Sequence, residues 1–445
     1  MRYTRRLLEL RLTGALAVIL AAGLCSVTAS CSSEDDPIAP PAAGDDASAA
    51  DAASDAVGVD AGRQDVGDAA PIDASPLPVD CNGPSCGVSI VAGPGESFCA
   101  LLQDGSVVCW GQNDTGQLGR GPDASSYGSE TPARVVDLPK IAHLGRSCAI
   151  DDTGGTWCWG TGPYLRDETN GTTKETTPVK LPIASAASAG VRSLYDFAVA
   201  CAASEGSVLC WGSNTNGQVA MPAAGADPFM GWAPQDVGVP PGAPIRELIV
   251  ADATFALRAD GSLSSWGANP PLGRLSSLFP DPHPKPIALP NVTSVDAMFD
   301  EVCAVSNGAV YCWGGRHDFA ATSPLVRALP ELVLTPEPVS QVATATTAFR
   351  DDHRRGCAVG LSGSVYCWWN NDRGQAGDGT KDFAIAPVKV KGLPAPVAEV
   401  RTTAKATCAL LTSGTIYCWG DDYFGQLGTG VMRSPDFAPQ EVVLP

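Results

Sequence analysis

Apolar and polar positions form a block that returns along the chain. Its clearest copy reads Cys99-Ala-Leu-Leu-Gln-Asp-Gly-Ser-Val-Val-Cys109-Trp-Gly. Two apolar runs flank a short polar turn, and this pattern predicts a β-hairpin. The block recurs with its first position at Cys148, Cys201, Phe255, Cys303, Cys357 and Cys408. Seven copies of about fifty residues each predict a repeat architecture whose unit has the size of a propeller blade.

Turn length and cysteine spacing change together in these hairpins. Cys99 and Cys109 lie ten residues apart, and a three-residue loop ending at Gly105 places them directly opposite each other. Four other units keep this spacing and have glycine at the same loop position: Gly154, Gly261, Gly363 and Gly414. Two units shorten the spacing to nine and the loop to two residues, Glu205-Gly206 and Asn307-Gly308. The second of these loops is a strong type I′ turn signal.

Opposed strand positions bring Cβ atoms close to the separation that a disulfide needs. We therefore expect six hairpin disulfides: Cys99–Cys109, Cys148–Cys158, Cys201–Cys210, Cys303–Cys312, Cys357–Cys367 and Cys408–Cys418. The fourth unit replaces both cysteines at once, with Phe255 and Ser265, and leaves no orphan thiol. Cys81 and Cys86 are expected to pair with each other.

Free buried thiols and metal ligation are the alternatives to these disulfides. Metal sites favour Cys-x-x-Cys spacing or histidine partners. The four histidines, His143, His283, His317 and His353, occupy unrelated positions in their units. The sequence therefore predicts disulfides, with no metal and no cofactor.

A tryptophan closes each hairpin: Trp110, Trp159, Trp211, Trp266, Trp313, Trp368 and Trp419. Seven aromatic side chains at equivalent positions suit either a ladder of ligand contacts or a packing position that is repeated because the blade is repeated. We favour packing, because large aromatic side chains are mostly buried in repeated cores.

Four units carry a further turn after the Trp-Gly pair: Gly116-Gln117-Leu118-Gly119, Gly217-Gln218-Val219-Ala220, Gly374-Gln375-Ala376-Gly377 and Gly425-Gln426-Leu427-Gly428. Together with the hairpins, these turns make residues 88–445 resemble the regulator-of-chromosome-condensation repeat family. The resemblance implies an all-β fold, a seven-bladed β-propeller with four-stranded blades. It also implies closure by strands from both chain ends, for which residues 88–91 and 441–444 are the candidates. Units two, four and five depart from the Gly-Gln pattern.

The N-terminus has the features of an export signal. Four arginines precede an apolar run over residues 12–24, which predicts a signal peptide over residues 1–30. The small residues before Cys31 resemble the lipobox of bacterial lipoproteins, so Cys31 is the expected lipid attachment site. Cleavage at Ala29 or Ser30 without lipid is the alternative. A lipid on Cys31 implies a location in the cell envelope, at the outer membrane or cell surface, whereas simple cleavage implies a secreted protein.

Residues 31–80 are rich in Ala, Asp and Pro and predict a disordered linker before a domain over residues 81–445. The formal net charge is −19, of which about −11 falls on residues 81–445. Beyond the leader, no basic cluster is larger than Arg354-Arg355. The absence of a basic patch argues against a nucleic-acid partner.

The sequence carries no recognisable catalytic elbow, phosphate loop, zinc motif or calcium loop. The family namesake is an exchange factor for a nuclear GTPase, and the leader, the acidic charge and the cysteines argue against that role. Secreted bacterial relatives include a β-lactamase inhibitor protein, and a similar architecture is no evidence for the same target.

We therefore expect a monomeric interaction module that binds a protein or glycan through propeller loops. Candidate anchors are Phe229 and Trp232 in the third unit and Tyr423 and Phe424 in the seventh, with packing against neighbouring blades as the alternative. An enzyme acting on an extracellular polymer, a lyase or hydrolase with its active site at the central channel, is the second hypothesis. Converging carboxylates or histidine in the channel would favour the enzyme, and an aromatic-lined rim would favour binding.

Overall fold

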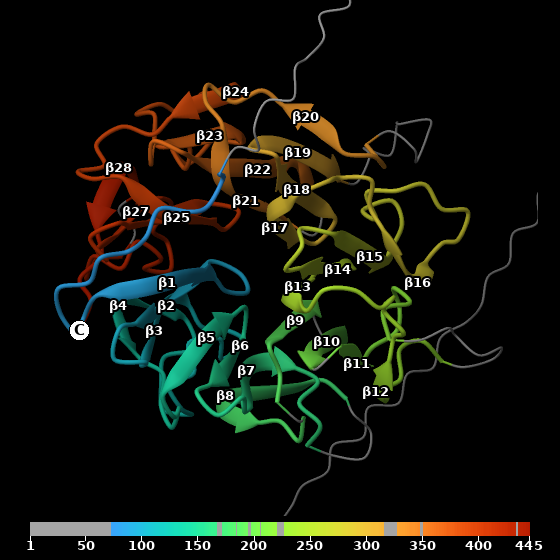
Figure 1. Cartoon of the computed structure of the whole chain (residues 1–445). Helices are drawn as coiled ribbons and strands as arrows, with labels where there is room; N and C mark the ends of the chain where they lie inside the picture. The colour runs from blue at the N-terminus through green and yellow to red at the C-terminus, as the bar shows by residue number, and fades with distance from the viewer. Residues whose placement is uncertain are drawn as a thin grey trace, which may run out of the picture. The chain divides into compact units, whose positions relative to one another are not determined.

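The computed structural model describes residues 73–166, 171–183, 185–194, 197–204, 206–219, 227–315, 327–347, 350–432 and 435–445. Within these residues the chain forms seven four-stranded antiparallel sheets, each made of four consecutive strands. The sheets stand around a central axis like the blades of a propeller (Figure 1). The predicted fold class, an all-β seven-bladed propeller, is confirmed.

The first four blades follow one another along the chain. Blade 1 contains β1 (Gly87–Ala92), β2 (Ser97–Leu102), β3 (Val107–Gln112) and β4 (Gly128–Arg134). Blade 2 contains β5 (Ile141–Gly145), β6 (Cys148–Asp151), β7 (Thr156–Gly162) and β8 (Thr173–Lys180). Blade 3 contains β9 (Ser188–Leu194), β10 (Phe197–Ser204), β11 (Ser207–Gly212) and β12 (Trp232–Asp236). Blade 4 contains β13 (Ile245–Val250), β14 (Ala253–Arg258), β15 (Leu263–Gly267) and β16 (Asp281–Pro286).

The last three blades repeat the same order. Blade 5 contains β17 (Val292–Met298), β18 (Glu301–Ser306), β19 (Ala309–Gly314) and β20 (Glu331–Val333). Blade 6 contains β21 (Val339–Thr347), β22 (Arg350–Gly360), β23 (Val365–Trp369) and β24 (Ala384–Lys389). Blade 7 contains β25 (Val397–Thr402), β26 (Ala406–Leu411), β27 (Ile416–Gly420) and β28 (Asp436–Glu441).

Two faces follow from this strand order, because successive strands are antiparallel. The turns between the second and third strands lie at one end of every blade, together with the links between blades. We call this end the hairpin face. The connections between the third and fourth strands lie at the other end, which we call the Gln-turn face. The first strand of each blade lines the central channel (Figure 1).

The hairpin register agrees with the prediction in every blade. The two cysteines are direct strand partners in blades 1, 2, 3, 5, 6 and 7. Phe255 and Ser265 face each other at the same position in blade 4. Six hairpin disulfides join the expected pairs, with Cα atoms 4.0–4.1 Å apart. Asn307 and Gly308 both have positive φ, as a type I′ turn requires.

Each tryptophan that closes a hairpin is buried against the preceding blade. All seven are at most 1% exposed. Six indole Nε1 atoms donate to a backbone carbonyl of the preceding blade at 2.5–3.0 Å. The carbonyl belongs to the Gln of the Gly-Gln turn, or to Pro163 and Pro271 in the units that lack this motif. For Trp368 the corresponding segment, residues 316–326, lies outside the described residues. The prediction of a repeated packing position is confirmed.

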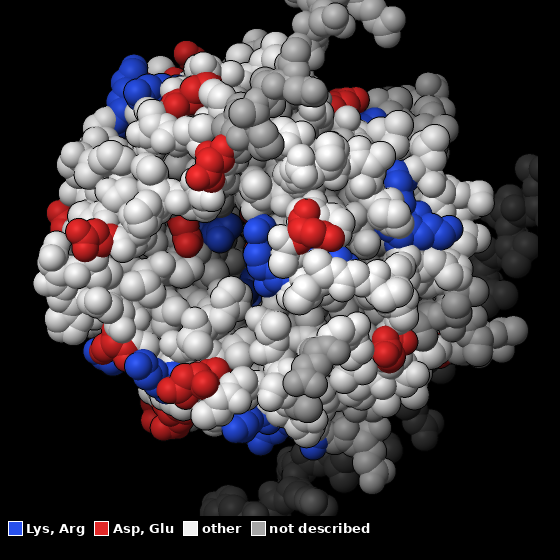
Figure 2. Space-filling model, viewed as in Figure 1, with Lys and Arg blue, Asp and Glu red and all other residues white. Residues whose placement is uncertain are grey.

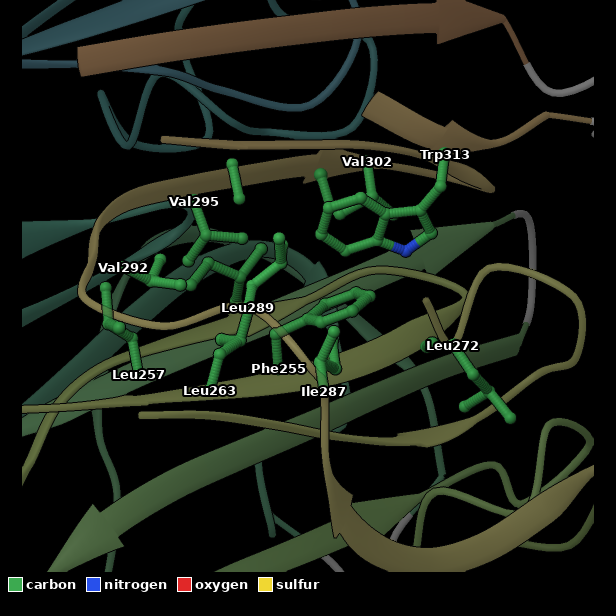
Figure 3. Close-up of a cluster of buried hydrophobic side chains, with 14 of the residues drawn as sticks. Phe255, Leu257, Leu263, Leu272, Ile287, Leu289, Val292, Val295, Val302 and Trp313 are labelled. Atoms are coloured by element: carbon green, nitrogen blue, oxygen red, sulfur yellow. The ribbon is translucent and has the colours of Figure 1, made fainter. Parts of the chain in front are cut away.

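Disulfides occupy the same interfaces as these indoles. Cys99 and Cys109, for example, pack in one buried cluster with Trp159 of the next blade. Blade 4 shows what replaces a disulfide, because Phe255 packs with Trp313 at a ring-centroid distance of 6.1 Å. Figure 3 shows the Phe255 ring beside the Trp313 indole among aliphatic side chains. The disulfide and the phenylalanine are therefore alternative fillings of one repeated space.

The glycines of the Gln turns make room for the indoles. Gly119 has φ +62°, and a Cβ there would approach Trp159 Cδ1 to 3.1 Å. An Asn or Asp at the start of the turn holds the apolar residue that follows. Asn113 Oδ1 accepts from Leu118 N at 3.1 Å, for instance. The turn sequence is thus explained by close packing rather than by ligand binding.

The expected closing segments meet, but they lie in separate sheets. Residues 88–91 belong to β1 of blade 1, and residues 442–444 follow β28 of blade 7. Val442 and Ile90 pack in the same buried cluster between the two blades. The ring is therefore closed by side-chain packing and hydrogen bonds between two complete blades, which corrects the expectation of closure by strands from both ends.

Residues 73–86 also contact the propeller. Ala74 is buried, and Asp80 N donates to Thr412 O at 2.8 Å. Cys81 and Cys86 form the expected disulfide. Part of the segment that the sequence assigns to the linker thus lies against the propeller: Leu77 lies beside Gly363 of blade 6, and Val79 and Asp80 contact blade 7.

Glu96 ties the first blade to the last at the Gln-turn face. Its carboxylate accepts from Thr403 Oγ1 and from Lys405 N, both in blade 7. Burial raises the pKa of Glu96 to about 7, against the partial opposition of the Thr403 hydrogen bond and the Lys405 charge. Between about pH 4.5 and pH 7, the Glu96 carboxyl is therefore protonated in the folded chain and ionised in the unfolded chain.

The raised pKa of Glu96 predicts a pH-dependent loss of stability. A carboxyl whose pKa rises on folding destabilises the folded state as the pH climbs from the unfolded toward the folded value. Urea unfolding should show the free energy of unfolding falling by about 1 kcal/mol between about pH 6 and pH 8. The Glu96→Gln variant should lose most of this fall, because its amide does not titrate.

The exposed Glu331 supplies the control. Glu331→Gln should keep the pH dependence of the parent protein. An equally steep fall in Glu96→Gln would show that another group is responsible.

Candidate functional site

The four aromatic residues singled out in the sequence lie on blades 3 and 7, toward the Gln-turn face. Phe229 is 58% exposed in the loop before β12. Trp232 begins β12 and packs at the edge of the cluster between blades 3 and 4. Phe229 therefore remains a candidate anchor, and Trp232 is better explained by packing.

Tyr423 and Phe424 form a three-ring cluster with Tyr127 of blade 1. The ring centroids of Tyr423 and Phe424 lie 5.0 Å apart, and Tyr127 lies 5.3 Å from Phe424. Tyr423 is 49% exposed. The cluster covers the junction of the first and last blades, so one edge packs and another faces solvent. Tyr127 was missed in the sequence because it follows a loop with no repeat signature.

A group of exposed apolar side chains occupies neighbouring loops of blades 3 and 4. It comprises Phe229, Met230, Leu275, Leu278 and Phe279, which are 41–81% exposed. We call this group the apolar loop patch. The loops approach each other, because a Cβ on Gly217 of blade 3 would lie 2.9 Å from Pro280 of blade 4. One predicted anchor, Phe229, thus lies on a loop next to a second loop whose exposed apolar residues the sequence did not single out.

The central channel contains a cavity of about 320 Å³. Its walls come from the inner strands of six blades, and its charged or titratable lining residues are His143, Arg146, Arg246, Glu247, Asp296, Glu399 and Arg401. Figure 2 shows basic and acidic side chains gathered at the hollow in the middle of the propeller. Apart from His143, no aromatic side chain lines this cavity.

Arg146 crosses one end of the cavity. Its Nε donates to Ala92 O at 3.2 Å, and its Nη1 donates to Ala297 O at 3.0 Å, so it links the inner strands of blades 1 and 5. Its Nη2 lies 3.6 Å from Asp296 Oδ1. Asp296 Oδ2 also accepts from Thr344 N at 2.9 Å. The Asp296 carboxylate is therefore held in place as a structural group.

Glu399 is engaged in a similar way. Its Oε2 accepts from Ile90 N at 3.2 Å and lies 3.8 Å from Arg401 Nη2. Arg401 Nε donates to Ile90 O at 2.9 Å. Burial opposes the Arg401 charge, but Glu399, Asp296 and Glu247 together raise the pKa of Arg401. Arg401 is therefore a cation that these contacts hold in the wall of the cavity.

His143 and Glu247 are the remaining titratable groups. His143 is exposed to the channel, where partial desolvation, and then the Arg401 charge, lower the pKa of its imidazole. Burial raises the pKa of Glu247, although Arg401 and Arg246 act in the opposite direction. No pattern in the sequence indicates this grouping, because its members come from different units.

Within the described ranges, no three His, Cys, Asp or Glu side chains are grouped to hold a metal ion. No helix there is long and apolar enough to cross a membrane. Cys31, the expected lipid site, lies outside the described residues.

Comparisons with known proteins agree with the fold. Models of the regulator of chromosome condensation (RCC1) repeat match residues 88–117, 104–148 and 402–426. The ultraviolet-B receptor UVR8 of Arabidopsis thaliana is 27% identical over 355 residues, which is 77% of this chain and 67% of the receptor. The human E3 ubiquitin-protein ligase HERC2 is 26% identical over 74% of this chain, but the match spans only 7% of the ligase.

Solved structures show the same architecture. Human WBSCR16 superposes with a TM-score of 0.61 at 19% identity, covering 76% of this chain and 94% of that protein. Prp20p of Saccharomyces cerevisiae gives a TM-score of 0.56 at 20% identity, covering 81% of this chain and 88% of that chain. The seven blades, their repeated turns and these matches together support an RCC1-like β-propeller.

Proposed function

We propose that this propeller is an exported interaction module that binds a protein partner through its Gln-turn face. The carrying observation is the apolar loop patch, in which five large apolar side chains on neighbouring loops are exposed. Several large exposed apolar side chains on neighbouring loops mark an interaction site more often than a single exposed apolar residue does. Aromatic anchors such as Phe229 supply most of the binding energy at such sites.

Export is supported by the chemistry of the cysteines. Seven disulfides would not persist in a reducing compartment. A protein partner, rather than a glycan, is favoured because three of the five patch side chains, Met230, Leu275 and Leu278, have no ring to stack on a sugar. The relatives point the same way, since one solved structure shows yeast RCC1 (Prp20) with Kap60 bound. That partner belongs to the yeast protein and gives no identity for the partner here.

The channel does hold carboxylates and a histidine, which was the stated sign of an enzyme. Two of its three carboxylates, however, accept backbone N–H bonds from neighbouring blades. Glu247 and His143 remain, and neither activates a nucleophile among the described residues. The geometry therefore favours binding over hydrolysis or lyase chemistry.

The apolar loop patch can be tested with a double substitution. Phe229→Ser with Leu275→Ser should leave the unfolding free energy within about 0.5 kcal/mol of the parent, since both side chains are exposed. Loss of such anchors should weaken partner binding by about thirtyfold. The measurement is cross-linking of the full chain in the envelope of the producing cell, followed by mass spectrometry and affinity measurement with the captured protein.

Ile385, 87% exposed on β24 of blade 6, provides a matched control. Ile385→Ser should retain the partner. Full retention by the double variant would contradict a role for the apolar loop patch, and capture of glycan alone would contradict a protein partner.

The proposed module is tethered by a lipid on Cys31. In a bacterial host the full chain should partition into the detergent phase of a Triton X-114 extraction, because an acylated N-terminus carries long apolar chains. Cys31→Ser should move the protein to the aqueous phase, and Cys25→Ser should not. Detergent partitioning that survives Cys31→Ser would rule out this tether.

A further inference from the structure

The inner strands place a ring of seven polar side chains around the channel. Each member lies two residues before the residue that faces the first cysteine of its blade, or Phe255 in blade 4. We call this set the polar ring, and its members are Ser89, His143, Ser188, Glu247, Ser294, Gln341 and Glu399. Seven polar residues at one register position require an explanation, because the adjacent inner-strand residues are mostly buried and apolar.

Structure alone explains four members. Each of these four accepts a hydrogen bond from a backbone N–H of the next blade's inner strand, and so links neighbouring blades. The acceptor and donor pairs are Ser188 with Leu248, Ser294 with Val342, Gln341 with Val400, and Glu399 with Ile90, at 2.9–3.3 Å. Ser89 instead donates to Glu399 at 3.4 Å.

His143 and Glu247 make no such link. Neither side chain has a hydrogen bond to another residue in the described ranges, and both line the channel cavity. Two residues further along the inner strand, at the position that faces the first cysteine, blades 2 and 3 have glycine, at Gly145 and Gly190. Both glycines also line the cavity. The structural role that accounts for the other members therefore leaves two polar groups facing open space.

The charges around this space are balanced. Arg146, Arg246 and Arg401 face Glu247, Asp296 and Glu399, but the bonds described above already engage Arg146, Asp296 and Glu399. Among the residues that the structure describes, Arg246 donates only through Nη2, to Thr293 O at 2.7 Å. A guanidinium has five N–H donors, so Arg246 and Arg401 retain donors for a ligand. Glu247 offers an acceptor nearby.

We propose that the channel cavity binds a small zwitterion of the amino-acid or short-peptide class. The ligand ammonium pairs with Glu247, its carboxylate with Arg246 and Arg401, and His143 adds a hydrogen bond. A cavity of about 320 Å³ suits a ligand of this size. The lining lacks an aromatic platform for stacking on a sugar ring, and its balanced charge gives no net attraction to a simple anion.

Isothermal titration of the full chain tests the proposal. The probes are the twenty L-amino acids and L-alanyl-L-alanine. At least one should bind, and its N-acetyl derivative and its methyl ester should each bind at least about tenfold more weakly, because each loses one of the two charges. Glu247→Gln should weaken the binding of the free zwitterion by a similar factor.

The variants separate binding from folding. Glu331→Gln, which removes an exposed carboxylate on β20, should leave affinity unchanged. If Glu247→Gln unfolds, the exposed Arg246→Gln variant replaces it and should weaken the zwitterion and its N-acetyl derivative alike. Absence of binding by every probe at about 10 mM would overturn the proposal. So would a Glu247→Gln variant that loses as much affinity for the N-acetyl derivative as for the free zwitterion, because that derivative has no ammonium for Glu247 to pair with.

Discussion

The propeller depends on one repeated contact, the burial of each hairpin tryptophan against the preceding blade. The indole supplies a large apolar surface, and in six described cases its N–H is satisfied by a turn carbonyl. The filling beneath it is a disulfide or, in blade 4, Phe255. Truncating such an indole to alanine typically costs about 3–5 kcal/mol. Because every hairpin tryptophan packs on the preceding blade, and Trp110 of blade 1 packs on blade 7, the interfaces form a closed ring.

That contact explains why so much of the fold is visible in the sequence. Hairpin length, the glycine at the turn and the cysteine spacing are local, so they fix the register of the second and third strands without knowledge of the rest. The replacement of both cysteines by Phe255 and Ser265 in blade 4 also pointed to pairing within the hairpin, because it too is a local change at two opposed positions. The turns after Trp-Gly were harder to predict in units that lack the Gly-Gln motif. There the indole N–H donates to the backbone carbonyl of Pro163 or Pro271, and a backbone carbonyl can come from any residue type.

The channel could not be predicted because the inner strand has no fixed distance from the hairpin. Gly145 faces a cysteine three residues later, whereas Ala343 faces one fourteen residues later. The polar ring therefore has no constant offset in the sequence. The apolar loop patch was found only at Phe229, because its other members lie in loops of irregular length. The polar ring and the apolar loop patch lie on inner strands and loops, whose positions and lengths vary between units. The repeated core constrains only the blades themselves.

The most direct test of this account is disulfide mapping of the unreduced protein, isolated from the cells that make it, by peptide mass spectrometry after alkylation of free thiols. The account predicts pairing within each of the six cysteine-bearing hairpins, a Cys81–Cys86 bridge and no alkylated cysteine among these fourteen. Pairing between different blades, or free thiols in the hairpins, would contradict it.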